Sequence, residues 1–124
     1  MLRYLAGLIL LSVALTPAVS AQEVTGTIVG TVTDASKAAI PGATVTVTST
    51  DRGLVVRSVT TDTAGGYVAT LLPIGNYSVK VEMTGFKPAA KRGIELHVND
   101  KLTFDFELEV GTVAQQVVVE ESVG

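Results

Sequence analysis

The alternation of apolar and polar residues is the feature that most limits how this chain can fold. It is clearest at residues 102–109, where the order is Leu102, Thr103, Phe104, Asp105, Phe106, Glu107, Leu108, Glu109. Successive side chains of a β-strand point to opposite faces of its sheet, so this order predicts a strand with one buried and one wet face. The same alternation recurs at 43–48, 77–82 and 94–99.

Turn-forming residues separate these segments. They include Pro41-Gly42, Asp51–Gly53, Asp62–Gly66, which is expected to close a hairpin, and Pro73–Asn76. Val and Thr, which favour pleated strands, supply 36 of the 124 residues. We therefore predict an all-β fold, a seven-stranded antiparallel Greek-key β-sandwich. Its strands are expected at 26–33, 43–50, 54–61, 66–71, 76–83, 93–98 and 101–109.

Two segments fit this scheme less simply. Val55, Val56 and Val59 cannot all face one way, which leaves the register of strand 54–61 open. In the tail, residues 111–124, Val117, Val118 and Val119 are adjacent and do not alternate. The alternatives for the tail are an additional short strand of the same sandwich, a disordered end, or a strand that pairs with a partner protein.

The first 21 residues have the layout of a secretory signal peptide. Arg3 is followed by an apolar run from Leu5 to Leu15, a helix-breaking Pro17, and small residues up to Ala21. The apolar run is shorter than the roughly 20 residues that a membrane-spanning helix needs. We therefore expect cleavage after Ala21 and export of the remaining chain.

Composition excludes several classes of function. The chain has no Cys, which excludes disulfides, thiolate metal sites, cysteine nucleophiles and lipid attachment at cysteine. After removal of residues 1–21, eight Lys and Arg remain against twelve Asp and Glu, a net charge of 8 − 12 = −4. Nucleic-acid binding depends on Lys and Arg that neutralise phosphates, so we expect no nucleic-acid partner.

Five short motifs follow one another in a recognisable order. They are Gly30–Asp34, Pro41–Val45, Thr61-Asp62 with Gly66-Tyr67, Leu72–Tyr77, and Gly85-Phe86. Together they resemble the carboxypeptidase regulatory-like domain, over residues 25–109. The resemblance implies a transthyretin-like β-sandwich, also grouped with carbohydrate-binding-like folds. It divides the chain into a signal peptide (1–21), this domain (22–110) and a C-terminal tail (111–124).

The arrangement is most similar to the N-terminus of Oar-like TonB-dependent outer-membrane receptors. In those proteins a signal peptide and this domain precede a segment similar to Glu109–Glu121, and then a plug and barrel. The chain is expected to be either a stand-alone or a truncated version of that front end. The resemblance implies a location in the periplasm or at the outer membrane of a Gram-negative bacterium, with membrane association expected only as part of a larger receptor.

No combination of residues predicts catalysis or a cofactor. His97, the single His, is expected on the solvent face, and Gly-x-Ser-x-Gly is absent from the sequence. Asp34, Asp51 and Asp62 stand at turn starts; they fit turn capping better than a calcium site. We therefore predict a non-catalytic domain without cofactor or metal. Asn76 begins a glycosylation sequon at a strand entry, which we discount in a bacterial chain.

The candidates for recognition are few. Tyr67, Tyr77, Phe104 and Phe106 share their side of the strands with apolar neighbours and are predicted to be core. Phe86, in a Gly-Phe-Lys-Pro bend, is the aromatic residue expected to be exposed. The candidate ligand or partner contacts are Phe86, Val117, Val118 and Val119. The predicted role is an interaction or spacer module of the cell envelope with protein partners, and the alternative is a carbohydrate-binding module that takes a glycan.

Overall fold

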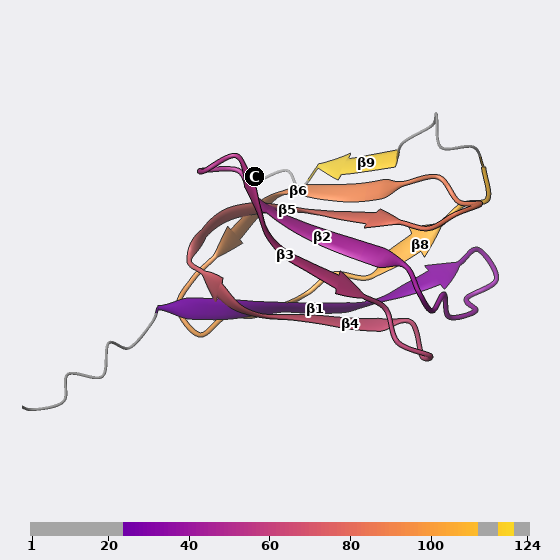
Figure 1. Cartoon of the computed structure of the whole chain (residues 1–124), viewed down its shortest axis with the longest axis horizontal. Coiled ribbons are helices and arrows are strands. Elements are labelled where there is room, and N and C mark those ends of the chain that lie inside the picture. Colours follow the sequence, from indigo (N-terminus) through magenta and orange to yellow (C-terminus); the bar gives the residue numbers. More distant parts are fainter. Residues whose placement is uncertain (1–23, 112–116, 121–124) are drawn as a thin grey trace, which may run out of the picture.

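The computed structural model describes residues 24–111 and 117–120, which form strands and their connections (Figure 1). None of the described residues forms a helix that could cross a membrane. Nine strands are present in this part: β1 (Thr25–Asp34), β2 (Thr44–Ser49), β3 (Leu54–Thr60), β4 (Gly66–Pro73), β5 (Gly75–Glu82), β6 (Ala89–Leu96), β7 (Lys101–Thr103), β8 (Phe106–Leu108) and β9 (Val117–Glu120).

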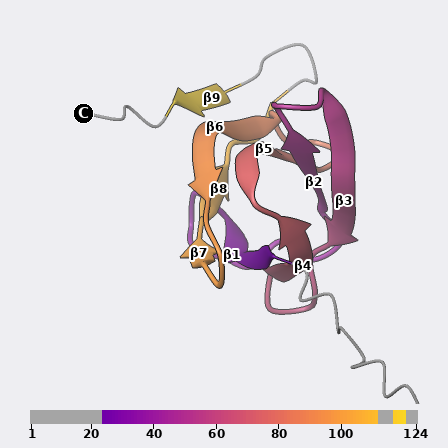
Figure 2. The ribbon, with the colours of Figure 1, turned by 90° about the vertical axis from the view of Figure 1, so that its left-hand side faces the viewer.

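β1 is the central strand of a four-stranded sheet. One edge of β1 pairs antiparallel with β4, and the other edge pairs in parallel first with β7 and then with β8. The end-on view in Figure 2 shows β1 between β4 and β7. The purely antiparallel arrangement predicted from the sequence is wrong here. β7 is reached from β6 in the other sheet and not through a hairpin from β1, so the connection does not impose antiparallel pairing.

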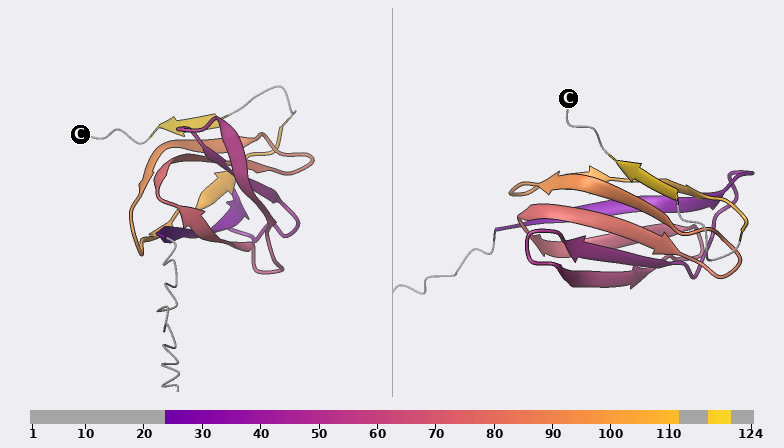
Figure 3. Two further views of the ribbon diagram at one scale, coloured as in Figure 1. Left: turned by 60° about the vertical axis from the view of Figure 1, so that its left-hand side comes forward. Right: turned by 90° about the horizontal axis from the view of Figure 1, so that it is seen from above.

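The second sheet has five strands in the order β3-β2-β5-β6-β9. The pairings among β3, β2, β5 and β6 are antiparallel, and β9 pairs in parallel with β6 at the sheet's edge. Both views in Figure 3 show β9 at the periphery, beside β6. Of the alternatives left open for residues 117–119, an additional strand of the same sandwich is the one observed.

The core lies between the inner faces of the two sheets. It contains the inward-facing half of each alternating segment, including Val45, Val47, Val79 and Val81, which are 0% exposed. The four aromatic residues predicted to be core are buried: Tyr67 is 3% exposed, Tyr77 2%, Phe104 9% and Phe106 7%. The alternation in the sequence therefore identifies the buried face of these strands correctly.

The predicted strand at 93–98 is displaced in the structure. β6 begins at Ala89 and ends at Leu96, before His97. A turn follows, in which the backbone N–H of His97 donates to Oδ2 of Asp100 (2.8 Å) and Asn99 adopts a positive φ of 62°. The alternation predicted an inward Val98, but the turn leaves this side chain 52% exposed.

The predicted strand at 101–109 is interrupted. Phe104 and Asp105 separate β7 from β8. At this point Oδ1 of Asp105 accepts hydrogen bonds from the backbone N–H (2.9 Å) and the hydroxyl of Thr31 (3.0 Å). The Asp105 carboxylate therefore accepts the Thr31 N–H in place of a backbone carbonyl, which interrupts the ladder between the two strands at this residue. This interruption and the tail strand β9 turn the predicted seven strands into nine.

A β-bulge explains the irregular valines of β3. Val47 pairs with Arg57 and Thr48 pairs with Val55, so Val56 is an extra residue in the ladder. Val56 and Val59 pack against the core from this edge strand, whereas Val55 is 56% exposed. The bulge changes which residues face inward, as an inserted residue must in a structure with a two-residue period.

The turn at residues 62–66 is tight but is not the hairpin predicted from the sequence. Oδ1 of Asp62 accepts hydrogen bonds from the N–H groups of Ala64 (2.9 Å) and Gly66 (2.8 Å). The strands on either side, β3 and β4, belong to different sheets. The turn therefore carries the chain from one layer of the sandwich to the other. Local turn chemistry cannot distinguish this connection from a hairpin.

Candidate functional site

A depression beside Phe86 is the first candidate site. It lies where β5 ends and β2 and β6 begin, and it has a volume of about 240 Å³. We call it the Phe86 depression; its lining consists of Gly42, Thr44, Glu82, Met83, Thr84, Phe86 and Pro88. Phe86, expected from the sequence to be exposed, is half-buried and packs partly against the core. Its backbone N–H donates to the carbonyl of Met83 (3.1 Å), and the preceding Gly85 has a φ of 88°.

The lining of the Phe86 depression combines apolar and hydrogen-bonding groups. Phe86, Met83 and Pro88 supply apolar surface, and Thr44 and Thr84 supply hydroxyl groups. The carboxylate of Glu82 is 49% exposed and lies 3.8 Å from Nζ of Lys80. Such a lining suits a ligand that has an apolar face and polar edges.

The tail reaches the same region of the fold. Val110 forms an antiparallel bridge with Phe86, and the backbone N–H of Lys87 donates to the carbonyl of Glu109 (2.7 Å). β9 then pairs with Ala89–Arg92 of β6. The structure therefore brings the two sequence candidates, Phe86 and residues 117–119, to the single segment 85–92. The side chains of Val117, Val118 and Val119 lie outside the described part.

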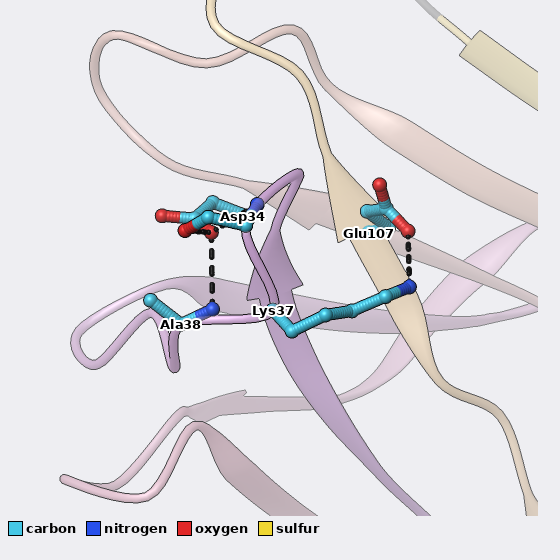
Figure 4. Close-up of polar contacts among 5 residues, drawn as sticks. Asp34, Lys37, Ala38 and Glu107 are labelled. Carbon is cyan, nitrogen blue, oxygen red and sulfur yellow. Dashed lines mark hydrogen bonds and ion pairs between the residues drawn. The ribbon is translucent and has the colours of Figure 1, made fainter.

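Asp34 serves the turn that follows β1. Its Oδ1 accepts hydrogen bonds from the hydroxyl of Ser36 (2.6 Å) and from the N–H groups of Ser36 (2.8 Å) and Ala38 (3.0 Å). The Ser36 hydroxyl, followed by the Ala38 N–H, lowers the pKa of the Asp34 carboxyl. In the same turn Lys37 has a φ of 70° and reaches Glu107 of β8, with Nζ 2.8 Å from Oε2 (Figure 4).

Asp51 also holds two loops together. Its Oδ2 accepts the backbone N–H of Asn76 (2.8 Å), and its Oδ1 accepts the side-chain amide of Asn76 (3.1 Å). These two hydrogen bonds lower the pKa of the Asp51 carboxyl. Among residues 24–111 and 117–120, no three His, Cys, Asp or Glu side chains gather as metal ligands would. The contacts of Asp34 and Asp62 are those of turn capping, whereas the turn-capping role predicted for Asp51 is replaced by its contact with Asn76, 25 positions away.

His97 lies on the solvent side, as the sequence predicts. Its side chain is 66% exposed, and its Nε2 lies 3.5 Å from Oε1 of Glu95, which is 65% exposed. An exposed pair of this kind is screened by water and fixes its partners weakly.

The two buried tyrosines use their hydroxyl groups inside the fold. Tyr67 donates to the carbonyl of Phe104, which ties β4 to the connection between β7 and β8. Tyr77 donates to the carbonyl of Pro73. Burial raises the pKa of both tyrosine hydroxyls above the ordinary value. Both rings belong to the core cluster between the two sheets.

Sequence reasoning missed a seam between the edge strands β3 and β4. Arg57 lies on the inner side of β3, and its Nη2 donates across the seam to the carbonyls of Thr70 (2.9 Å) and Leu71 (3.4 Å). Leu71 has a positive φ of 55° and a side chain that is 63% exposed. The irregular run Val55-Val56 signals the bulge next to Arg57. No feature of the sequence indicates the left-handed backbone at Leu71.

Comparison with solved structures agrees with the sandwich. A streptococcal ancillary pilin superposes with a TM-score of 0.56 at 18% identity, covering 72% of this chain and 33% of the pilin. The Bacillus anthracis TIE protein superposes with a TM-score of 0.58 at 20% identity, covering 74% of this chain and 20% of that protein. A proposed carbohydrate-binding protein of Bacteroides uniformis superposes with a TM-score of 0.53 at 16% identity, covering 67% of this chain and 40% of that protein. At these identities the likeness concerns the fold alone.

Sequence comparison is more specific. The TonB-dependent transporter Oar of Myxococcus xanthus is 40% identical over 83 residues, which are 66% of this chain and 8% of the transporter. This chain therefore corresponds to a small part of that relative. Residues 27–109 match the profile of the carboxypeptidase regulatory-like domain, nearly the range 25–109 over which the sequence resembles it. The chain belongs to the carboxypeptidase regulatory-like domain family.

Proposed function

We propose that this chain is a non-catalytic, exported interaction or spacer module of the Gram-negative cell envelope. Its membership of the carboxypeptidase regulatory-like family and its likeness to a small part of a TonB-dependent transporter support this role. The module would consist of residues 22–110, and the tail, residues 111–124, would add the edge strand β9 to it. Residues 1–21 would be removed as a signal peptide, which predicts a mature protein that begins at Gln22 in the periplasm.

The position of the Phe86 depression is the observation that carries the interaction role. It adjoins the bridge between Phe86 and Val110, where the chain leaves the two sheets. A protein bound there would contact the module and the segment that follows it together. The capping aspartates and the buried tyrosines are already engaged inside the fold, whereas Thr84 and Glu82 present polar groups to a partner.

Carbohydrate binding is the second candidate, and the same depression favours it. Phe86, Thr44, Thr84 and Glu82 all line this depression, which therefore offers an aromatic side chain, two hydroxyl groups and a carboxylate. Sugars present apolar C–H faces and hydroxyl edges, which an aromatic ring and polar acceptors can bind. The proposed carbohydrate-binding protein of Bacteroides uniformis shares the fold and supports this alternative by analogy only.

Two NMR titrations of the labelled chain would separate these roles. A TonB periplasmic domain is added in the first and a panel of soluble glycans in the second, and the shifts of the Phe86, Met83 and Thr84 amides are followed. We expect shifts with the protein that Phe86→Ala removes and that Val98→Ala, at an exposed site in the turn beyond the end of β6, leaves unchanged. Shifts with a glycan alone would favour the second candidate.

The absence of amide shift changes in both titrations would favour the spacer role over the interaction role. A hydrolase activity of the purified chain that His97→Ala abolishes would contradict both candidates, because each assumes a module without catalysis.

A further inference from the structure

The turn between β5 and β6 shapes the Phe86 depression. We call residues 83–88 the β5–β6 turn; it follows the end of β5 and precedes the start of β6. Four of the seven residues that line the depression belong to this turn. Inside it, the N–H of Phe86 donates to the carbonyl of Met83 (3.1 Å), and Gly85 has a φ of 88°. A turn that rested on such a bond alone would distort easily, so the contacts that hold it from outside decide the shape of the depression.

Residues 109–111, which follow β8, hold the β5–β6 turn through two backbone hydrogen bonds. The N–H of Lys87 donates to the carbonyl of Glu109 (2.7 Å). The N–H of Gly111 donates to the carbonyl of Gly85 (3.2 Å). Figure 1 shows the chain after β8 passing beside the connection of β5 and β6. We call residues 109–111 the clamp.

Phe86 and Val110 face each other as partners of an antiparallel bridge. The hydrogen bonds on either side make this a non-hydrogen-bonded pair, in which the N–H groups of both residues point away from the opposite segment. The Val110 side chain is 78% exposed, whereas Phe86 is half-buried against the core. The clamp therefore holds Phe86 through the backbone bonds of its neighbours, Gly85 and Lys87.

The side chain of Lys87 lies along the clamp. Its stem covers Gly111, where an added Cβ would be 2.5 Å from Cγ of the lysine. Its Nζ lies 3.5 Å from Oε2 of Glu109, a carboxylate that is 63% exposed. An ion pair as exposed as this adds little stability. The two backbone hydrogen bonds are therefore the main contacts that close the clamp.

The clamp is weaker than the sandwich that carries it. A single hydrogen bond contributes little net free energy, whereas the strands on either side share one buried core. Segments held by a few bonds open locally far more often than a whole domain unfolds. Two states follow: a closed one, in which Phe86 is fixed beside the depression, and an open one, in which residues 109–111 have left the β5–β6 turn.

We propose that the clamp controls whether the Phe86 depression can bind a partner. The inference rests on the proposed function, because it takes the depression as the binding site. A partner that fits the depression binds the closed state, and by linkage its binding tightens the clamp. Conversely, anything that captures residues 109–111 opens the clamp and weakens binding in the depression. The exit of the chain from the sandwich and the binding site are thus two coupled parts of the molecule.

Two neighbouring proline substitutions in the full chain test the clamp without a ligand. Gly111→Pro removes the N–H that donates to Gly85 and pushes a ring against the Lys87 stem, and both effects open the clamp. Val110→Pro is the matched control, because the N–H of Val110 points away from the turn and its side chain is exposed. We expect hydrogen exchange of the Lys87 amide to rise at least about fivefold in Gly111→Pro, as for the loss of one hydrogen bond, and to change little in Val110→Pro.

The position of the Phe86 side chain is measured separately by fluorescence. The chain has no Trp, so Phe86→Trp introduces a single reporter. Added to this background, Gly111→Pro should move the emission to longer wavelength and increase quenching by acrylamide, because the ring becomes more exposed to water. Val110→Pro should leave both unchanged.

Three results would overturn the clamp. In the first, Gly111→Pro speeds exchange at Lys87 but leaves the emission of the Phe86→Trp reporter unchanged, so the clamp does not position this side chain. In the second, exchange at Lys87 does not change, so the turn does not depend on the bond to Gly111. In the third, the amide of Val79, in the buried part of β5, speeds up by the same factor, so the substitution acts on the whole domain.

The coupling to binding is tested with a TonB periplasmic domain as the probe. We expect Gly111→Pro to raise its Kd at least about fivefold and Val98→Ala, in the turn beyond the end of β6, to leave it unchanged. An equal Kd for Gly111→Pro and the unmodified chain would contradict the coupling. Absence of binding by the unmodified chain would count against the proposed interaction role, whereas the exchange and fluorescence measurements, which need no ligand, decide the clamp by themselves.

Discussion

The carbonyl oxygen of Phe104 lies 1.8 Å from the position that a Cβ on Gly30 would occupy. The hydroxyl of Tyr67 is 2.7 Å from the same position, and the N–H of Phe104 donates to the carbonyl of Val29 (2.8 Å). Three segments, from β1, β4 and the connection between β7 and β8, therefore meet where Gly30 has no side chain.

Gly30→Ala is expected to destabilise the domain by about 3 kcal/mol or more, because backbone must move to admit the methyl group. Chemical unfolding at equilibrium measures this cost. Gly53→Ala is the control: Gly53 has a φ of 65° with open space around its Cβ position, so the change should cost only about 1 to 2 kcal/mol. Equal losses of unfolding free energy in the two variants would show that the structure admits a methyl group at Gly30 with little strain.

Phe106 and Glu107 are neighbours in β8 on opposite faces. Phe106 is 7% exposed, whereas the side chain of Glu107 is 45% exposed and paired with Lys37 at the surface. Phe106→Ala should cost about 3 to 5 kcal/mol as a core truncation. Glu107→Ala should cost about 0.5 kcal/mol or less, since exposed ion pairs contribute little. Similar unfolding free energies for the two variants would show that Phe106 and Glu107 are wrongly assigned to the core and solvent faces of β8.

Leu71→Gly is expected to stabilise the protein by about 0.5 to 1 kcal/mol. A leucine at a φ of 55° is strained, and this side chain is 63% exposed, so glycine relieves the strain and loses little burial. Val68→Gly, in the same strand at 56% exposure and without a positive φ, should destabilise the protein by about 1 kcal/mol. Thermal and chemical unfolding of both variants should therefore show changes of opposite sign.

Acid should weaken the turn at Asp34. Its hydrogen bonds hold the pKa of the folded-state carboxyl below the ordinary value of 3.8. The stabilisation is therefore present above the unfolded-state pKa and is lost as pH falls through the folded-state pKa. Asp34→Asn should be less stable than the unmodified chain at pH 7, and the difference should shrink between about pH 5 and pH 2. If the stability difference between Asp34→Asn and the unmodified chain stays constant over this pH range, the loss does not come from the charge of the Asp34 carboxylate.

The parts of the fold that sequence predicts are those set by local chemistry. Alternation identifies the inward faces of β2, β5 and β8, and the Pro41-Gly42 turn has the positive φ of 79° that glycine permits. The interruption between β7 and β8 depends on Asp105 replacing a ladder bond to Thr31, which lies 74 positions away. A contact at that separation leaves no local pattern in the sequence.

The same limit applies to the candidate site. Phe86 is identifiable as an aromatic residue in a glycine-containing bend, but its pairing with Val110 is not. Arg57 resembles any arginine in an edge strand until the bulge at Val56 turns it toward the carbonyls of Thr70 and Leu71. The start of β6 is also hidden, because Ala89 and Ala90 carry a weak hydrophobic signal.

The parallel pairing of β1 with β7 and β8 affects the order in which the protein can fold. β1 is the first described strand, yet one of its edges stays open until residues 101–108 have been synthesised. Contacts between distant parts of a chain form slowly, because a long loop must close before they are gained. We therefore expect the sheet around β1 to be completed late in folding, after residues 101–108 have become available to pair with it.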